Sequence, residues 1–125
     1  WEKAARGTDG RTYPWGEGID RQKANYGGGP GQTTEVGSYE EGVSPYGVHD
    51  MAGNVWQWLS DWYDSGYYAV SPARNPQGPE SGTFRVLRGG SWGSNPYSLR
   101  STYRIRNPPA TTGGFIGFRC VRSAG

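Results

Sequence analysis

The sequence predicts one loop-rich α+β domain with short antiparallel strands and little regular secondary structure. Gly and Pro together supply 31 of the 125 residues, whereas Leu, Ile, Val and Phe supply only 16. Both figures are typical of disordered chains. Yet aromatic residues make up 14% of the chain and the formal net charge is only +2. Disordered segments are poor in aromatics and rich in net charge, so we expect a folded domain with a core of large rings and closely packed backbone.

The regular elements are expected to be few and short. Residues 1–6 favour a helix that Gly7 ends, and this helix begins without a visible cap. We therefore expect a preceding segment, from the same or another chain, to complete the fold. Residues 54–61 suit either a strand or a helical turn, because periodicity does not separate the two. Strands are predicted over residues 33–39, 84–88, 98–104 and 116–121, with loops over 7–32, 63–82 and 107–114.

Tryptophan is expected to supply much of the core volume. Aliphatic side chains are scarce, so Trp56, Trp58, Trp62 and Trp92 are predicted to be largely buried. After the strand at 84–88, the pair Gly89-Gly90 predicts a bulge or a close approach of backbone.

Several classes of protein are excluded by composition. No window approaches 18 apolar residues, so we expect no membrane insertion. The single cysteine, Cys120, excludes an internal disulfide and a cysteine-rich zinc site. The single histidine, His49, excludes a three-histidine metal centre.

Charge is divided unevenly along the chain. Residues 1–80 carry six Lys or Arg against eleven Asp or Glu, whereas residues 81–125 carry seven Arg and no acid. An arginine-rich half is typical of proteins that bind nucleic acids or acidic ligands. Here the arginines form no basic run, so a nucleic-acid partner is not expected. We favour the alternative, that the two halves neutralise each other within one fold.

Five motifs carry a family resemblance. They are WEKAARG at 1–7, YPWG at 13–16, YGVHDMAGNVWQW at 46–58, RVLRGGSW at 85–92 and GFRC at 117–120. In this order they resemble the formylglycine-generating enzyme (sulfatase-modifying factor) family. The resemblance implies a modified C-type-lectin fold. It also implies that residues 1–125 are the C-terminal part of a single such domain.

The same resemblance implies that catalysis is absent. Oxidases of the family hold copper with two cysteines, five residues apart, that follow the Gly-Gly-Ser motif. The corresponding positions here are Ser94 and Leu99, and a hydroxyl and an alkyl group do not replace soft thiolates for copper(I). Relatives that make carbon–sulfur bonds in thiohistidine synthesis use a three-histidine iron site. We expect no catalytic residue, copper or iron. The alternative is a degenerate or incomplete oxidase or thiohistidine-synthase-type domain.

Residues 88–120 resemble the variable region of proteins diversified by diversity-generating retroelements. In those systems AAC codons are mutated at their adenines, and the products never include Lys, Glu, Gln, Met or Trp. Residues 93–120 contain none of these five types, whereas residues 1–92 contain nineteen. The alternative is a plain family domain whose loop lacks them. The implied ligand-binding positions are Gly93, Ser94, Asn95, Tyr97, Ser98, Ile105, Asn107, Ala110, Thr112, Gly113, Gly114 and Phe115.

These positions predict a non-catalytic module that binds a protein or other macromolecule through residues 93–115. A site that tolerates many side chains does not belong in a close-packed core, so the positions should share one exposed surface. Aromatic side chains there offer rigid contact area, and Ser, Thr, Asn and Gly offer adaptable hydrogen bonds. The framework side chains Leu99, Tyr103, Ile116 and Phe118 should point inward.

Calcium is the cofactor that the resemblance implies. The first set of ligands would be the Asp50 and Gln57 side chains with the Gly53 and Val55 carbonyls, all oxygen donors. Gln57 stands where the family has Glu, which removes one negative charge. The alternative is that Asp50 and Gln57 bond loop amides. A second family site would begin with Asn25 and the Tyr26 carbonyl, but its downstream Asp has no counterpart.

Overall fold

The computed structural model describes residues 1–124, which contain one α-helix and one small sheet. Helix α1 spans Glu2–Arg6, begins at Trp1 without a side-chain cap, and ends at Gly7, as the sequence predicts. Three short 3-10 helices span Glu40–Gly42, Tyr67–Ala69 and Pro96–Leu99. Across the part of the chain that is described, no helix combines the length and apolar character needed to cross a bilayer.

Four strands form the sheet, in the order β3-β2-β1-β4. Their bounds are Trp56–Trp62 for β1, Arg85–Arg88 for β2, Arg104–Asn107 for β3 and Ile116–Gly117 for β4. Strands β1, β2 and β3 pair antiparallel, but β4 runs parallel to β1. The sheet is therefore mixed: the short antiparallel strands are present as predicted, and β4 adds one parallel pair.

Three of the predicted strands are shorter than expected or absent. Residues 33–39 form no strand and contain one turn at residues 36–37, and residues 98–104 lie mostly in the Pro96–Leu99 helix and the turn after it. The last strand stops at Gly117 instead of continuing to residue 121. The segment at 54–61, left open between strand and helical turn, forms most of β1.

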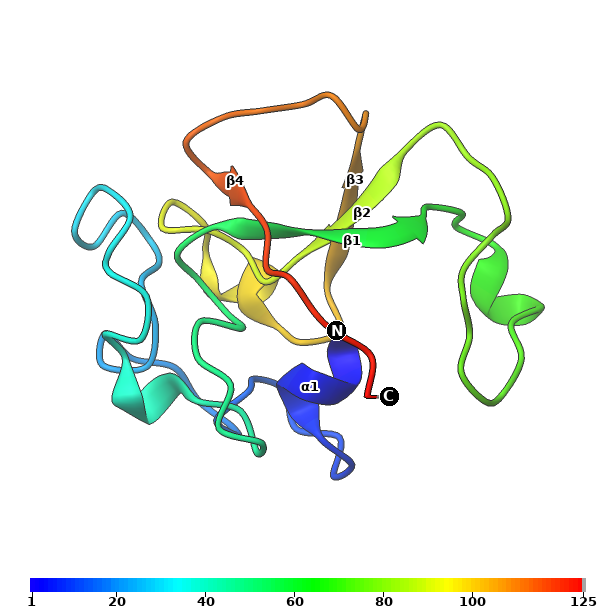
Figure 1. Ribbon diagram of the computed structural model, residues 1–125. Helices are drawn as coiled ribbons and strands as arrows, with labels where there is room; N and C mark the ends of the chain where they lie inside the picture. Colours follow the sequence, from blue (N-terminus) through cyan, green and yellow to red (C-terminus); the bar gives the residue numbers. More distant parts are fainter. Residues whose placement is uncertain (125) are drawn as a thin grey trace.

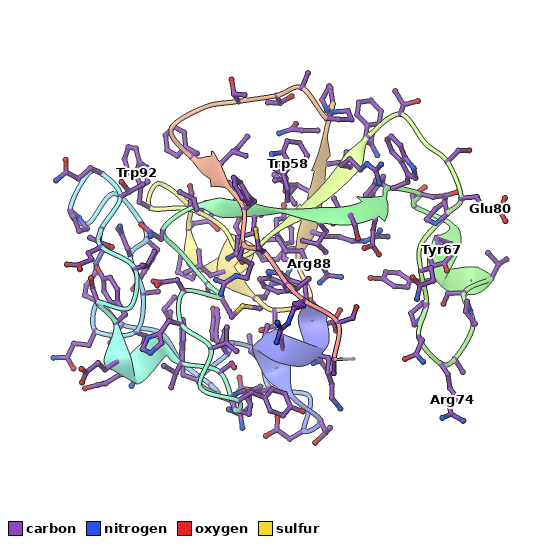
Figure 2. The ribbon with its side chains drawn as sticks, in the orientation of Figure 1. Trp58, Tyr67, Arg74, Glu80, Arg88 and Trp92 are labelled. Carbon is purple, nitrogen blue, oxygen red and sulfur yellow. The ribbon has the colours of Figure 1, made fainter. Side chains whose placement is uncertain are left out.

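The two faces of the sheet have different neighbours. Gln57 is paired with Arg88, and Trp58 with Leu87, so these pairs point to opposite faces. Figure 1 shows α1 below the sheet and the β3–β4 loop above it. In Figure 2, Arg88 lies on the α1 side of β1 and Trp58 on the other side. We call these the helix face and the open face.

The fully buried core is made of small and aliphatic side chains. Trp56, Trp58, Trp62 and Trp92 are each half-buried and none is mostly exposed, so they pack around the core without forming its fully buried centre. An indole is large and carries an N–H that needs a partner, which keeps it at the margin of a core. The buried apolar residues are Ala5, Tyr13, Ala24, Met51, Ala52, Val86, Leu87 and Leu99.

Glycine lets the backbone approach closely, as the composition predicts. A Cβ on Gly53, whose φ is +81°, would lie 2.5 Å from the Asn25 carbonyl oxygen. A Cβ on Gly90, at φ +71°, would lie 2.7 Å from Leu99 Cδ1. Such contacts exclude a side chain, so the loops around β1 and β2 pack backbone against core.

Candidate functional site

The twelve predicted ligand-binding positions all lie at the surface. Eight are exposed, namely Gly93, Asn95, Tyr97, Ala110, Thr112, Gly113, Gly114 and Phe115. The other four, Ser94, Ser98, Ile105 and Asn107, are half-buried. Tyr97 is 61% exposed and Phe115 is 44% exposed, although ordinary burial preferences would place a phenylalanine inside. We call these twelve residues the candidate binding surface.

Stacked rings join the two loops of the candidate binding surface. The Trp92 and Phe115 rings lie 4.5 Å apart between centroids and are inclined by only 17°. Trp92 Nε1 also donates to the Gly114 carbonyl at 3.2 Å. A Cβ added to Gly93 would lie 2.9 Å from the Phe115 ring. The loop that starts at Gly93 and the loop that ends at Phe115 are therefore neighbours.

A second aromatic row reaches the same region from β1. The Tyr97 and Tyr103 rings meet edge to face at 5.1 Å, and the Tyr103 and Trp56 rings are 6.2 Å apart. Tyr103 is half-buried between its two neighbours. Rings in contact lose little conformational freedom when a ligand binds, so this row offers a rigid platform.

The alternation of β3 separates candidate positions from framework positions. Ile105 is paired with the fully buried Leu87, and Asn107 is paired with Arg85. Both candidates therefore point to the open face, whereas Arg104 points to the helix face. A strand with this pattern permits changes on one face without disturbing the other.

The predicted framework is only partly correct. Leu99 is fully buried, and Tyr103 and Ile116 are half-buried. Phe118, however, is 76% exposed, so its predicted inward position is wrong. Strand β4 ends at Gly117, and the alternation of a strand does not extend to Phe118.

The two positions that resemblance assigns to copper cysteines have structural roles instead. Ser94 Oγ accepts a hydrogen bond from the Ser91 amide at 2.9 Å. The Leu99 side chain is fully buried against Gly90 and the neighbouring core. An alkyl side chain held in the core offers no donor atom to a metal.

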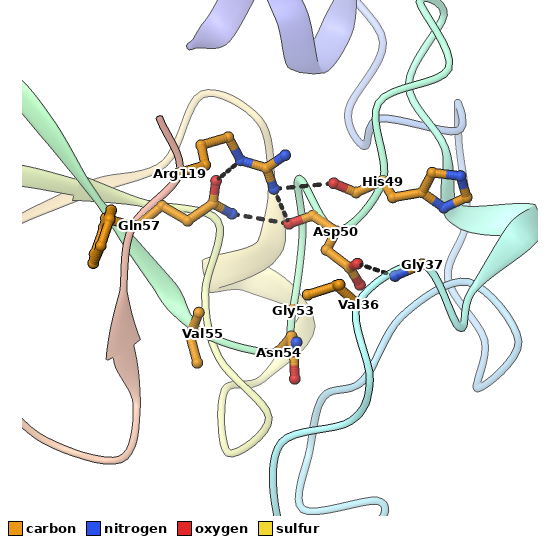
Figure 3. A pocket seen from close by; sticks show the side chains of 10 residues that line it. Val36, Gly37, His49, Asp50, Gly53, Asn54, Val55, Gln57 and Arg119 are labelled. Atoms are coloured by element: carbon orange, nitrogen blue, oxygen red, sulfur yellow. Dashed lines mark hydrogen bonds between the residues drawn. The ribbon is translucent and has the colours of Figure 1, made fainter. Parts of the chain in front are cut away.

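The predicted calcium residues do come together, around a cavity of about 340 Å³. Its lining includes Asp50, Gly53, Val55 and Gln57 from the loop before β1 and from β1 itself. It also includes Arg119, which enters from the segment after β4, as Figure 3 shows.

The side-chain oxygen of Gln57 already accepts two hydrogen bonds. Its Oε1 accepts from Trp1 Nε1 at 3.0 Å and from Arg119 Nε at 2.6 Å, while its Nε2 donates to the Asp50 carbonyl at 2.9 Å. A carbonyl oxygen has two lone pairs, so neither is left for a metal ion. Gln57 instead joins α1, the 49–50 loop and the segment after β4.

The cavity also holds a positive charge of its own. An Arg119 terminal nitrogen donates to the His49 and Asp50 carbonyls at 3.0 and 2.9 Å. Burial lowers the pKa of Arg119 from its usual range, but arginine stays protonated at neutral pH. The Asp50 carboxylate turns away and accepts from the Gly37 amide at 2.7 Å. A guanidinium beside the proposed ligands repels calcium, so this set does not fit the ion.

The second predicted calcium set is not assembled either. The Tyr26 carbonyl accepts from the Gly29 amide at 3.0 Å and from the Arg21 guanidinium. Asn25 is buried, and its Oδ1 has no hydrogen-bond partner within residues 1–124. One oxygen alone does not hold calcium, which takes six to eight. Over the same residues, no group of three or more His, Cys, Asp or Glu is placed to bind a metal.

Three arginines hold loop backbone. Arg88 donates to the Ser101 carbonyl, Arg104 to the Asp64 carbonyl and Arg119 to the His49 carbonyl. The Trp1–Gln57 bond had no signal in the sequence, because 56 residues separate the partners. The packing of arginines against aromatic rings was not predicted either. The seven arginines of residues 81–125 are interspersed with aromatic residues, and this pattern was the available signal.

Comparison with known proteins agrees with the motif resemblance. A family model described as the sulfatase-modifying factor enzyme 1-like domain (FGE-sulfatase) matches residues 1–124. The serine/threonine-protein kinase pkn1 of Chlamydia pneumoniae is 44% identical over 126 residues, which are 98% of this chain and 20% of the kinase. The formylglycine-generating enzyme of Streptomyces coelicolor is 39% identical over 142 residues, covering 99% of this chain and 45% of the enzyme.

A solved structure gives the same result for the fold. Treponema denticola variable protein 1 superposes with a TM-score of 0.74 and 30% identity, over 94% of this chain and 41% of that protein. The loop-rich C-type-lectin-type fold and the resemblance to a variable protein are thereby confirmed. The chain spans less than half the length of each of these three proteins.

Proposed function

The chain belongs to the sulfatase-modifying factor enzyme 1-like family, and from this membership we propose that it is a non-catalytic module that binds a protein ligand. The ligand contacts the candidate binding surface within residues 93–115. Residues 88–120 form the variable region, and retroelement-type mutation diversifies the contact positions. The buried framework beneath them keeps one conformation while they change.

The observation that carries this proposal is the contrast between neighbouring positions. Ile105 is half-buried on the open face, while its register partner Leu87 is completely buried. Phe115 is exposed and stacks on Trp92 outside the core. Large apolar side chains held at the surface beside aromatic rings are typical of interaction sites.

The absence of catalysis is supported by the side chains at the two copper-cysteine positions. Ser94 and Leu99 supply no thiolate, and Leu99 is locked in the core. The variety of relatives is a second support. The same domain matches a fifth of a protein kinase and under half of a variable protein, so the fold serves proteins with different activities.

A display library tests the proposal. In the chain displayed on yeast, NNC codons replace those of Tyr97, Ile105, Asn107, Ala110, Thr112 and Phe115. A matched library places the same codons at the framework positions Val86, Leu87, Leu99, Ser101 and Ile116. We expect the first library to keep its display level and to yield binders to unrelated purified proteins. The second should lose display. A first library that fails to fold would contradict the proposal.

A second candidate function is oxidation of a substrate cysteine. It is favoured by the 39% identity to the Streptomyces coelicolor enzyme. Purified protein loaded with copper(I) and given a sulfatase-type cysteine peptide distinguishes the two by mass spectrometry. We expect no loss of the thiol mass. Formation of the aldehyde would establish the enzyme and contradict the binding module.

A further inference from the structure

Four arginines around strand β3 face aromatic rings in place of carboxylates. They are Arg85, Arg100, Arg104 and Arg106, and their rings are Trp62, Tyr63, Tyr68, Phe84, Tyr97 and Tyr103. We call this set the arginine–aromatic surface. The sequence favoured neutralisation of the arginine-rich half by the acidic half. Within residues 1–124 only Arg88 of that half forms a salt bridge, with Glu2, so these four arginines have no carboxylate in direct contact.

Each guanidinium lies within cation–π distance of an aromatic ring. The Arg85 guanidinium carbon lies 3.5 Å from the centre of the Trp62 ring, and that of Arg100 lies 3.7 Å from the centre of Tyr97. Arg104 lies 4.5 Å from Tyr68, and Arg106 lies 4.9 Å from Tyr63. A guanidinium in contact with a ring loses less conformational freedom when it binds a partner, which favours affinity.

Most N–H donors of these arginines have no acceptor among the residues that the structure describes. A guanidinium carries five donors in a planar fork. Arg100 gives one to the Tyr97 carbonyl and Arg104 gives one to the Asp64 carbonyl. Arg85 donates to the Ser60 carbonyl, and Arg106 has no hydrogen-bond acceptor within residues 1–124. The free edges match carboxylates, which accept two parallel bonds from one fork.

The arginine–aromatic surface meets the candidate binding surface at the β3 edge. Arg100 stacks on the candidate residue Tyr97. On β3, Arg104 and Arg106 point to the helix face and the candidate Ile105 between them points to the open face. Strand β3 is at the edge of the sheet, so an extended ligand segment along it reaches both faces. Fixed charges and changeable side chains thus meet the same ligand from the two sides of this edge.

We propose that this surface binds an acidic segment of a protein ligand along the β3 edge. This rests on the proposed function and adds the chemistry of the partner. The fixed arginines attract carboxylates in any ligand, and the neighbouring candidate side chains select among ligands. A polypeptide is favoured over nucleic acid because the whole chain carries only +2, and residues 1–80, with five more acids than bases, repel a long polyanion.

Binding of a random copolymer of Glu and Tyr, measured by biolayer interferometry on the full chain, tests this inference. We expect binding that weakens as NaCl rises from about 50 to about 300 mM, because salt screens exposed charges. The double variant Arg104→Gln/Arg106→Gln should lose affinity roughly tenfold. Arg122→Gln, an exposed arginine outside the surface, is the matched control and should leave affinity unchanged. Circular dichroism confirms that each variant is folded.

Three results would overturn the inference. They are binding to poly-lysine as tight as to the copolymer, binding to oligo-thymidylate as tight as to the copolymer, and equal losses in the control and the double variant. Failure of the proposed function has a different signature. There the copolymer binds, but the library of candidate positions yields no selective binders.

Discussion

Arg119 Nε donates a 2.6 Å hydrogen bond to Gln57 Oε1 across 62 residues of sequence. This contact joins the segment after β4 to strand β1. Trp1, the residue before α1, donates a hydrogen bond to the same oxygen. The resemblance assigns Gln57 to a calcium ion. The guanidinium of Arg119 instead supplies the positive charge that joins these segments.

Removing the guanidinium should therefore destabilise the fold. Arg119→Met keeps the length of the side chain but leaves Gln57 Oε1 and two loop carbonyls with fewer donors. Unsatisfied polar groups cost about 1–3 kcal/mol each when buried, and partial solvent access reduces that cost here. We expect a loss of about 2 kcal/mol in the free energy of unfolding, measured in urea. Arg122→Met is the control, and an equal loss there would contradict the role of Arg119.

Calcium should leave the stability of the protein unchanged. A ligand that binds only the folded state raises its melting temperature by mass action. Because both lone pairs of Gln57 Oε1 are used, we expect the same Tm with calcium chloride and with EGTA in a thermal shift assay. A rise in Tm that follows the calcium concentration would show that the folded protein binds the ion, which would contradict this expectation.

The register pair Leu87 and Ile105 should respond very differently to truncation. Leu87 is fully buried, so Leu87→Ala should cost about 2–5 kcal/mol. Ile105 is half-buried on the open face, so Ile105→Ala should cost about 1 kcal/mol or less. Chemical denaturation of both variants gives the comparison. An equal cost would place Ile105 in the core and remove it from the variable positions.

Local signals in the sequence predicted the elements that depend on neighbouring residues. Gly7 ends α1 and the Gly89-Gly90 pair packs against the core, both as expected. The strand predicted over 33–39 fails because of a distant side chain. The Asn54 side chain accepts a hydrogen bond from the Thr34 backbone N–H and donates one to the Thr34 carbonyl. These two bonds take the place of a partner strand.

The remaining differences also arise from long-range contacts. Arg119 draws the chain toward Gln57 and the 49–50 loop, so β4 ends at Gly117 instead of residue 121. The exposure of eight of the twelve candidate positions was predicted correctly, because a position that tolerates many side chains does not lie in a close-packed core. The burial of Phe118 depended on a strand that the tertiary contacts cut short.

Sequencing of codons 84–120 and of the flanking DNA in a population of the source organism tests the central claim most directly. The account predicts a near-copy of the region, beside a reverse-transcriptase gene, with AAC codons at the candidate positions. Variation within the population should fall on positions such as Ile105 and Phe115 and spare Leu87 and Leu99. Absence of a near-copy, or variation spread equally over surface and core codons, would contradict diversification and leave a plain family domain.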